Sequence, residues 1–133
     1  VIVSDDREID WGECDVFKKV KILNCKMQNI ADKMNITKNT YIVITTRGNS
    51  IDIEGLPGLM DYEWAYLGVI GSKRRWHITK SELIKIGKSI NVLDKIRSPI
   101  GLDIHAETPE EIAISIMAEI ICVKNNYRIK DQN

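Results

Sequence analysis

Five consecutive residues combine a turn, a helix cap and three cations. Gly71 and Ser72 precede Lys73, Arg74 and Arg75, and serine is a natural helix N-cap. The positive end of a helix dipole disfavours exposed cations by about 0.3–1 kcal/mol each. A bound phosphate removes this conflict, because free N–H groups and basic side chains then converge on one anion. The pattern therefore predicts an anion site, and the alternative is a solvated basic helix face.

A second group of charged residues, Asp5, Asp6 and Arg7, follows the first apolar run of the chain. A carboxylate at the end of a strand accepts ribose hydroxyls in dinucleotide-binding folds. The alternative is an ordinary acidic turn. No G-x-G-x-x-G loop occurs in the sequence, and Gly68 and Gly71 provide only G-x-x-G spacing.

Two further loops carry residues that can meet a ligand. Arg47 and Gly48 follow the central apolar run and can approach a ligand at the sheet edge, or else belong to a polar loop. Asp103 and His105 lie in a long connection and can do acid–base chemistry. Such residues more often hold a loop together, so no catalytic residue is assigned. No residue spacing predicts a metal site.

The elements that position these groups follow from hydrophobic periodicity. Apolar, β-rich runs predict strands at 1–3, 20–23, 41–46 and 65–70. Helical spacing predicts helices at 27–34, 73–87 and 92–96, and a last helix that ends near residue 123. Strands that alternate with helices predict a three-layer α/β fold with a mostly parallel sheet.

The last helix has the clearest start signal. Thr108 provides an N-cap hydroxyl, Pro109 suits the first helical position, and Glu111 completes a capping box. Isoleucines at 112, 116 and 120 repeat every four residues. We therefore expect this stripe to be buried against the sheet.

Composition limits the classes of function. The 133 residues are enough for about one domain, which we place at 1–124 with a polar tail at 125–133. The charges of the 19 basic and 19 acidic residues cancel. A neutral protein is not expected to bind nucleic acid or an anionic membrane over its whole surface. No apolar run approaches the about 18 residues of a membrane span. Three cysteines without C-x-x-C spacing favour a reducing cytoplasm.

These segments together resemble a known family. The blocks YLGVIGSKRR at 66–75, PIGLDI at 99–104 and AETPEEIAISIMAEI at 106–120 are similar to the C-terminal domain of the XdhC/CoxI family. Thr46, Arg47 and Gly48 with Asp52, and DDRE at 5–8, also fit its pattern. The resemblance covers nearly the whole chain and implies a Rossmann-like fold.

The resemblance implies an accessory factor rather than an enzyme. Family members act as chaperones in the maturation of molybdenum hydroxylases such as xanthine dehydrogenase. They are implied to bind the molybdenum cofactor (molybdopterin), assist its sulfuration and deliver it to the apo-enzyme. The expected cofactor-binding residues are those singled out above: Asp5, Arg7, Arg47, Gly48, Gly71, Ser72, Lys73, Arg74, Arg75 and Asp103. The alternatives are an NAD(P)-binding domain of oxidoreductase type and a non-catalytic docking domain.

The predicted sheet lacks its first, glycine-rich βα unit. The first strand of a Rossmann-like sheet is central, and the run at 1–3 corresponds to the second strand. Without the central strand, two apolar strand edges face a gap. Three arrangements are open: a preceding segment of the same protein, a partner copy in a homodimer, or a rearranged strand order. We favour the preceding segment.

Overall fold

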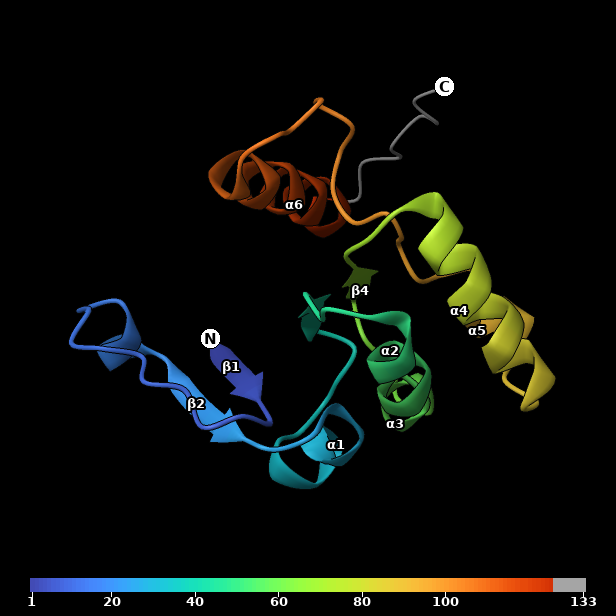
Figure 1. The fold of residues 1–133 in the computed structure, drawn as a ribbon, viewed down its shortest axis with the longest axis horizontal. Helices are drawn as coiled ribbons and strands as arrows, with labels where there is room; N and C mark the ends of the chain where they lie inside the picture. The colour runs from blue at the N-terminus through green and yellow to red at the C-terminus, as the bar shows by residue number, and fades with distance from the viewer. Residues whose placement is uncertain (126–133) are drawn as a thin grey trace.

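The computed structural model describes residues 1–125 and has an α/β architecture (Figure 1). Its strands are β1 (Ile2–Asp5), β2 (Lys21–Asn24), β3 (Tyr41–Ile44) and β4 (Tyr66–Val69). Its α-helices are α1 (Ile30–Lys33), α2 (Asn49–Gly55), α3 (Pro57–Met60), α4 (Lys73–Lys85), α5 (Ile90–Leu93) and α6 (Pro109–Lys124). The 3-10 turns η1 (Phe17–Lys19) and η2 (Met27–Asn29) complete the described chain. Of the expected polar tail, 126–133 lies outside the described residues.

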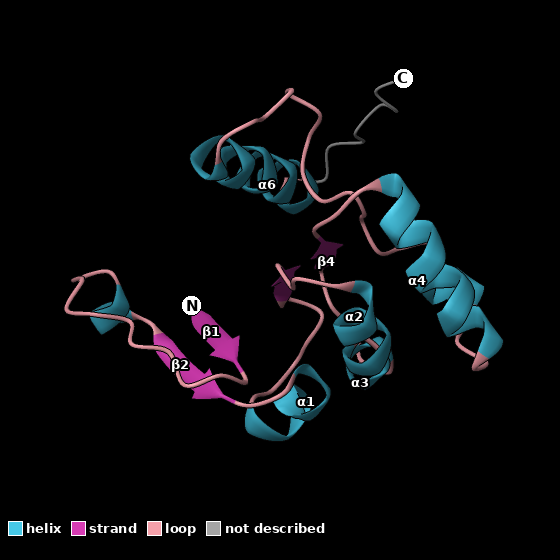
Figure 2. Ribbon diagram, viewed as in Figure 1, coloured by secondary structure: helices cyan, strands magenta, loops and turns pink. Residues whose placement is uncertain are grey.

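The four strands form two parallel pairs. β1 pairs with β2, with Ile2 opposite Lys21, and β3 pairs with β4, with Tyr41 opposite Tyr66. Figure 2 shows the pairs as separate groups of magenta arrows. The predicted α/β class and the parallel strands are confirmed. The strands lie in two two-stranded sheets because, in residues 1–125, β1 and β3 form no ladder with each other.

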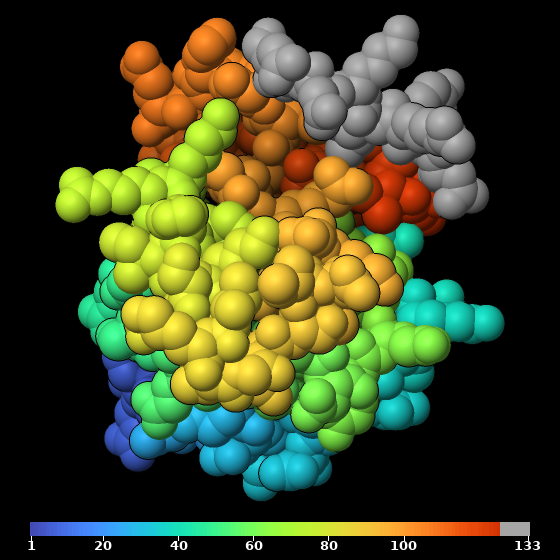
Figure 3. All heavy atoms as spheres, turned by 90° about the vertical axis from the view of Figure 1, so that its right-hand side faces the viewer, coloured from blue at the N-terminus to red at the C-terminus, as the bar shows by residue number. Residues whose placement is uncertain are grey.

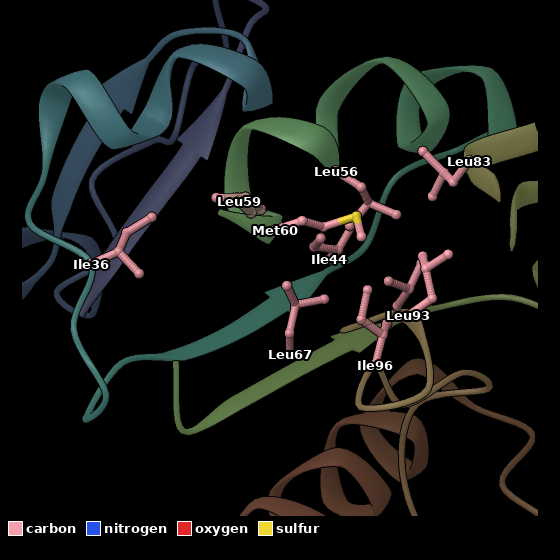
Figure 4. Close-up of a cluster of buried hydrophobic side chains, with 10 residues drawn as sticks. Ile36, Ile44, Leu56, Leu59, Met60, Leu67, Leu83, Leu93 and Ile96 are labelled. Atoms are coloured by element: carbon pink, nitrogen blue, oxygen red, sulfur yellow. The ribbon is translucent and has the colours of Figure 1, made fainter. Parts of the chain in front are cut away.

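The hydrophobic core lies on one face of β3 and β4. Ile44 and Leu67 point from the strands toward leucines and isoleucines of α2, α3, α4 and the α5 region (Figure 4). Leu56, Leu83 and Leu93 are fully buried there. Helices α2 and α3 were not predicted, because at seven and four residues they are too short to show a helical period.

The opposite face of β4 packs on α6 through a polar contact. The Tyr66 hydroxyl donates a 2.6 Å hydrogen bond to Glu119 of α6, and the Gly101 N–H donates to the same oxygen over 3.1 Å. Burial, and then the hydrogen bond to Glu119, raise the pKa of the Tyr66 hydroxyl well above its usual range. Because Glu119 is 6% exposed, its two donors replace water that the carboxylate loses.

The expected isoleucine stripe of α6 is buried only in part. Ile116 is 8% exposed, as predicted, whereas Ile112 and Ile120 are half-buried. Ser115 and Glu119 take the other buried positions. A side chain at Gly101 would overlap the Ser115 hydroxyl, so beside Ile116 the helix α6 also makes a close backbone contact with Gly101.

No helix within residues 1–125 combines the length and the apolar character that crossing a membrane requires.

The predicted capping box of α6 is present. The Glu111 N–H donates to the Thr108 hydroxyl over 3.2 Å, and the Thr108 N–H donates to the Glu111 carboxylate over 3.0 Å. We expect Thr108→Ala to lower the free energy of unfolding by about 1 kcal/mol, because a helix N–H loses its acceptor. Thr108→Ser keeps the hydroxyl and is the matched control. Equal losses in both variants by chemical denaturation would contradict the role of the cap.

Candidate ligand site at the carboxyl ends of the strands

A carboxylate–guanidinium clamp closes the end of β1. The Arg7 side chain donates from Nε to Asp5 Oδ1 over 2.9 Å and from Nη2 to Oδ2 over 2.7 Å. The Arg7 backbone N–H also donates to Asp5, over 2.9 Å. Asn24, at the end of β2, donates to the Arg7 carbonyl over 2.8 Å. The clamp is thus a bidentate ion pair at the end of β1 that also receives a hydrogen bond from β2.

The clamp changes the acidity of Asp5. The hydrogen bonds from Arg7 lower the pKa of the Asp5 carboxyl from 3.8 to about 2, and the positive charge of Arg47 contributes to the shift. Arg47 follows β3 and lines the same cavity as Asp5, so the two strand ends lie near each other. The structure therefore brings together two of the groups that the sequence singled out.

Two cavities meet at the clamp. One has a volume of about 480 Å³ and is lined by Asp5, Arg7, Trp11 and the ends of both strands. The other has a volume of about 390 Å³ and extends from Asp5 to Thr46 and Arg47. Both volumes lie within the range of about 300–1,000 Å³ that is typical of small-molecule sites. Trp11 adds an aromatic surface that the sequence analysis did not include.

A buried ion pair connects the remaining elements of the site. Arg75 of α4 donates to Asp52 Oδ2 over 2.6 Å and to the Thr46 hydroxyl over 2.9 Å. Thr46 in turn donates to the other Asp52 oxygen. Asp52 is fully buried, and the Arg75 side chain is 21% exposed. This Asp52–Arg75–Thr46 cluster ties α2, α4 and the end of β3 together.

The cluster leaves two of the three cations at the start of α4 open to a ligand. The charge of Arg75 is paired with Asp52, whereas Lys73 and Arg74 are exposed and form no ion pair with any residue of 1–125. Side chains from the first turn of α4, in yellow-green, project from the surface in Figure 3. Ser72 is the N-cap, as expected, and accepts from the Arg75 N–H over 3.1 Å. Phosphate binding by this turn stays a prediction.

Glycine is required at Gly71 for two reasons. Its φ of +136° is a conformation that other residues rarely adopt. A Cβ there would also lie 2.8 Å from the Arg75 Cδ. Gly71 therefore lets the Arg75 side chain cross the backbone to reach Asp52. Gly48, by contrast, is the N-cap of α2 in an extended conformation.

Other candidate residues lie away from the two cavities. Asp103 accepts a 3.3 Å hydrogen bond from the His105 N–H, and neither residue lines the cavities described above. His105 has a φ of 56°, so the pair belongs to a turn. The three cysteines are free, and Cys25 lines the smaller cavity. Residues 1–125 contain no group of three His, Cys, Asp or Glu residues arranged to hold a metal ion.

The fold and the site define a Rossmann-like α/β domain with charged groups at the carboxyl ends of its strands, where such sheets bind ligands. The profile of the family described as the XdhC Rossmann domain matches residues 1–120. The chain therefore belongs to the XdhC family, and the resemblance stated from its sequence is confirmed.

Two proteins illustrate the relationship. An Escherichia coli (strain K12) protein, "Uncharacterized protein YqeB", is 36% identical over 95 residues, which is 71% of this chain and 17% of that protein. A crystal structure titled as a xanthine dehydrogenase from Bacillus halodurans superimposes with a TM-score of 0.65 at 32% identity. The match covers 85% of this chain and 31% of that chain. The chain thus spans less than a third of either relative.

The buried cluster leads to a stability prediction. Arg75→Met leaves the Asp52 carboxylate buried without its cation, and we expect a loss of about 3–5 kcal/mol in the free energy of unfolding. Arg74→Met, one residue away but exposed, is the matched control and should change stability by less than about 0.5 kcal/mol. Denaturant titration of both variants provides the measurement. Similar losses in the two would show that the ion pair does not stabilise the fold.

The clamp leads to a prediction about pH. Because the folded pKa of Asp5 lies below its ordinary value, the clamp stabilises the protein above about pH 4, and this contribution is lost as the pH falls through about 2. Carboxyl NMR titration should place Asp5 near 2, and Arg7→Gln should return it toward 3.8. Lys18→Gln, which removes a different surface ion pair, is the control. An Asp5 midpoint near 3.8 in the unmodified protein would exclude the clamp in solution.

Proposed function

We propose that this protein is an accessory factor for molybdenum hydroxylases of the xanthine dehydrogenase type, which binds the molybdenum cofactor and assists its insertion into the apo-enzyme. Membership of the XdhC family supports this role. The observation that carries it is the meeting of two cavities at the Asp5–Arg7 clamp, next to Arg47. The proposed partner is an apo molybdenum hydroxylase, and the free cysteines suit a cytoplasmic location.

The residues at the site fit the chemistry of the cofactor. A pterin phosphate offers ring N–H donors at one end and a dianion at the other. Asp5 Oδ2 accepts one hydrogen bond from Arg7 and keeps a further lone pair for a ring donor, while Arg47, which forms no ion pair with the described residues, supplies a cation. Bound there, the cofactor would bring the molybdenum centre that a hydroxylase requires. The chain's own part is to bind and orient it.

The cluster behind the site keeps these groups in place. Arg47 directly follows Thr46, whose carbonyl accepts from both terminal nitrogens of Arg75 over 3.3 Å. Asp52, three residues beyond the α2 start, closes the same cluster. The backbone that carries Arg47 is therefore anchored on its amino side. An anchored backbone limits the positions open to the Arg47 side chain, which lowers the entropy cost of placing its charge on an anion.

A second candidate, an NAD(P)-binding domain, rests on one observation. Asp5 lies at the carboxyl end of β1, where dinucleotide folds place the acid that accepts ribose hydroxyls. Trp11 lines the adjoining cavity and offers a surface on which a base can stack. The two candidates therefore use the same carboxylate, and a direct binding comparison separates them.

Titration of the purified protein with molybdenum cofactor and, separately, with NADPH tests both candidates. We expect saturable binding of the molybdenum cofactor, weakened about 10-fold or more by Arg47→Ala, because a charge-assisted hydrogen bond is lost. Lys85→Ala, which removes an exposed cation at the other end of α4, is the control and should bind normally. Binding of NADPH alone would favour the dinucleotide domain. Failure to bind either ligand would favour a docking role.

A further inference from the structure

The charge distribution of α6 is the reverse of that expected for a surface helix. Such a helix normally turns its apolar side chains inward and its charged side chains outward. Between Ile112 and Val123, however, the one charged residue is Glu119. Its carboxylate is buried and accepts hydrogen bonds from Tyr66 and Gly101. The outward face of this part of α6 therefore carries no charge.

The outward face carries large apolar side chains instead. Ile114 is 63% exposed, Met117 is 54% exposed and Ile121 is 51% exposed. At 3.6 residues per turn, these three residues share one side of the helix, opposite the buried Ser115 and Glu119. An exposed apolar patch of this kind, bordered by polar residues, marks a surface that another molecule covers.

Residues of opposite charge continue this side of the helix at its two ends. Glu110 lies four residues before Ile114, and Lys124 lies three residues after Ile121. Both are exposed, and neither forms an ion pair with another residue of 1–125. The α6 stripe, as we name it, thus consists of positions 110, 114, 117, 121 and 124. Its alternating steps of four and three residues are those of the seam between two helices of a coiled coil.

The α6 stripe is complementary to itself when two copies run in opposite directions. Glu110 lies seven residues before Met117, and Lys124 lies seven residues after it. A two-fold axis through Met117 therefore brings Glu110 of one copy level with Lys124 of the other, at both ends of the pair. The apolar residues of the two stripes meet between these ends. In a parallel pair, each charge would instead face its own kind, which is unfavourable.

We propose that the α6 stripe is the contact surface of a homodimer, in which α6 packs antiparallel against α6 of a second copy of this chain. A two-fold contact uses the same patch on both subunits, so the patch must be complementary to itself. The α6 stripe meets this requirement in both hydrophobicity and charge. Burial of its apolar side chains drives the association, and the two Glu110–Lys124 pairs set the direction of the helices.

The proposed contact leaves the ligand site accessible. No residue of the α6 stripe lines either of the two cavities at the Asp5–Arg7 clamp. The contact also leaves the strand edges untouched, so it differs from a dimer that forms by strand pairing. Self-association and cofactor binding can therefore be measured separately, and neither result decides the other.

Sedimentation velocity from about 1 to 300 µM protein tests the proposal, because a contact between two single helices is small and such contacts are weak. We expect the purified protein to dimerise in this range. Met117→Lys places like charges on the two-fold axis and should raise the dissociation constant about 100-fold or more. Ile86→Lys replaces an exposed isoleucine at the end of α4 and is the matched control, which should dimerise normally.

Charge reversal tests the direction of the helix pair. Glu110→Lys and Lys124→Glu each place like charges at both ends of the antiparallel dimer, and each should raise the dissociation constant about 10-fold. The double variant restores opposite charges at both ends, as does an equimolar mixture of the two single variants. Both should dimerise about as well as the unmodified protein. Lys33→Glu changes the charge of an exposed lysine on α1 and is the control.

Three outcomes would overturn the proposal. A protein that stays monomeric at about 300 µM would leave the α6 stripe to a different molecule, such as the apo-hydroxylase. A dimer that Met117→Lys does not weaken, while Ile86→Lys does, would use another surface. Single charge reversals that leave the dimer unchanged, or a double variant that associates no better than either of them, would exclude the antiparallel pair.

Discussion

The Asp52 carboxylate is the group on which the arrangement of the site depends. It is fully buried, so it requires a cation and hydrogen-bond donors in place of water. Arg75 and Thr46 supply them, and each comes from a different element. Satisfying one buried charge therefore fixes where α2 and α4 begin relative to the end of β3. Gly71 belongs to the same constraint, because a side chain there would obstruct Arg75.

This constraint divides the basic residues of α4 by role. Arg75 lies three positions after the N-cap and turns inward, where its charge is neutralised. Lys73 and Arg74 stay exposed at the positive end of the helix, without a carboxylate among the described residues to offset them. The unfavourable interaction of cations with the helix dipole thus applies to two residues rather than three. Their charge is available to an anion, and the charge of Arg75 is not.

Local signals predicted much of the fold. The four strands and α6 follow from short apolar runs and from a capping box, both of which are readable within a few residues. The partition of the strands into two pairs was not predictable from periodicity, because hydrophobic patterns identify strands but not their neighbours. The buried face of α6 differs from its isoleucine stripe for a related reason. Tyr66 and Gly101 determine which residues of α6 face inward, and both are distant in sequence.

The candidate site shows the same limit. Asp5, Arg7 and Arg47 were identified because charged residues after apolar runs mark the carboxyl ends of strands. That Arg7 would clamp Asp5 depends on a turn of two residues, whose geometry the residue types alone do not specify. Trp11 was missed because the residues around it show no helical or strand periodicity.

The separation of the two strand pairs bears directly on how the site works. Asp5 is held by β1 and β2, and the backbone before Arg47 by β3 and the Asp52 cluster, so each backbone segment is anchored within its own half. Among residues 1–125, no backbone ladder connects the halves. The distance between the Asp5 carboxylate and the Arg47 cation, which line the same cavity, is therefore not fixed by strand pairing. A ligand that touches both Asp5 and Arg47 would bind more tightly once that distance is fixed, since less conformational freedom is lost on binding.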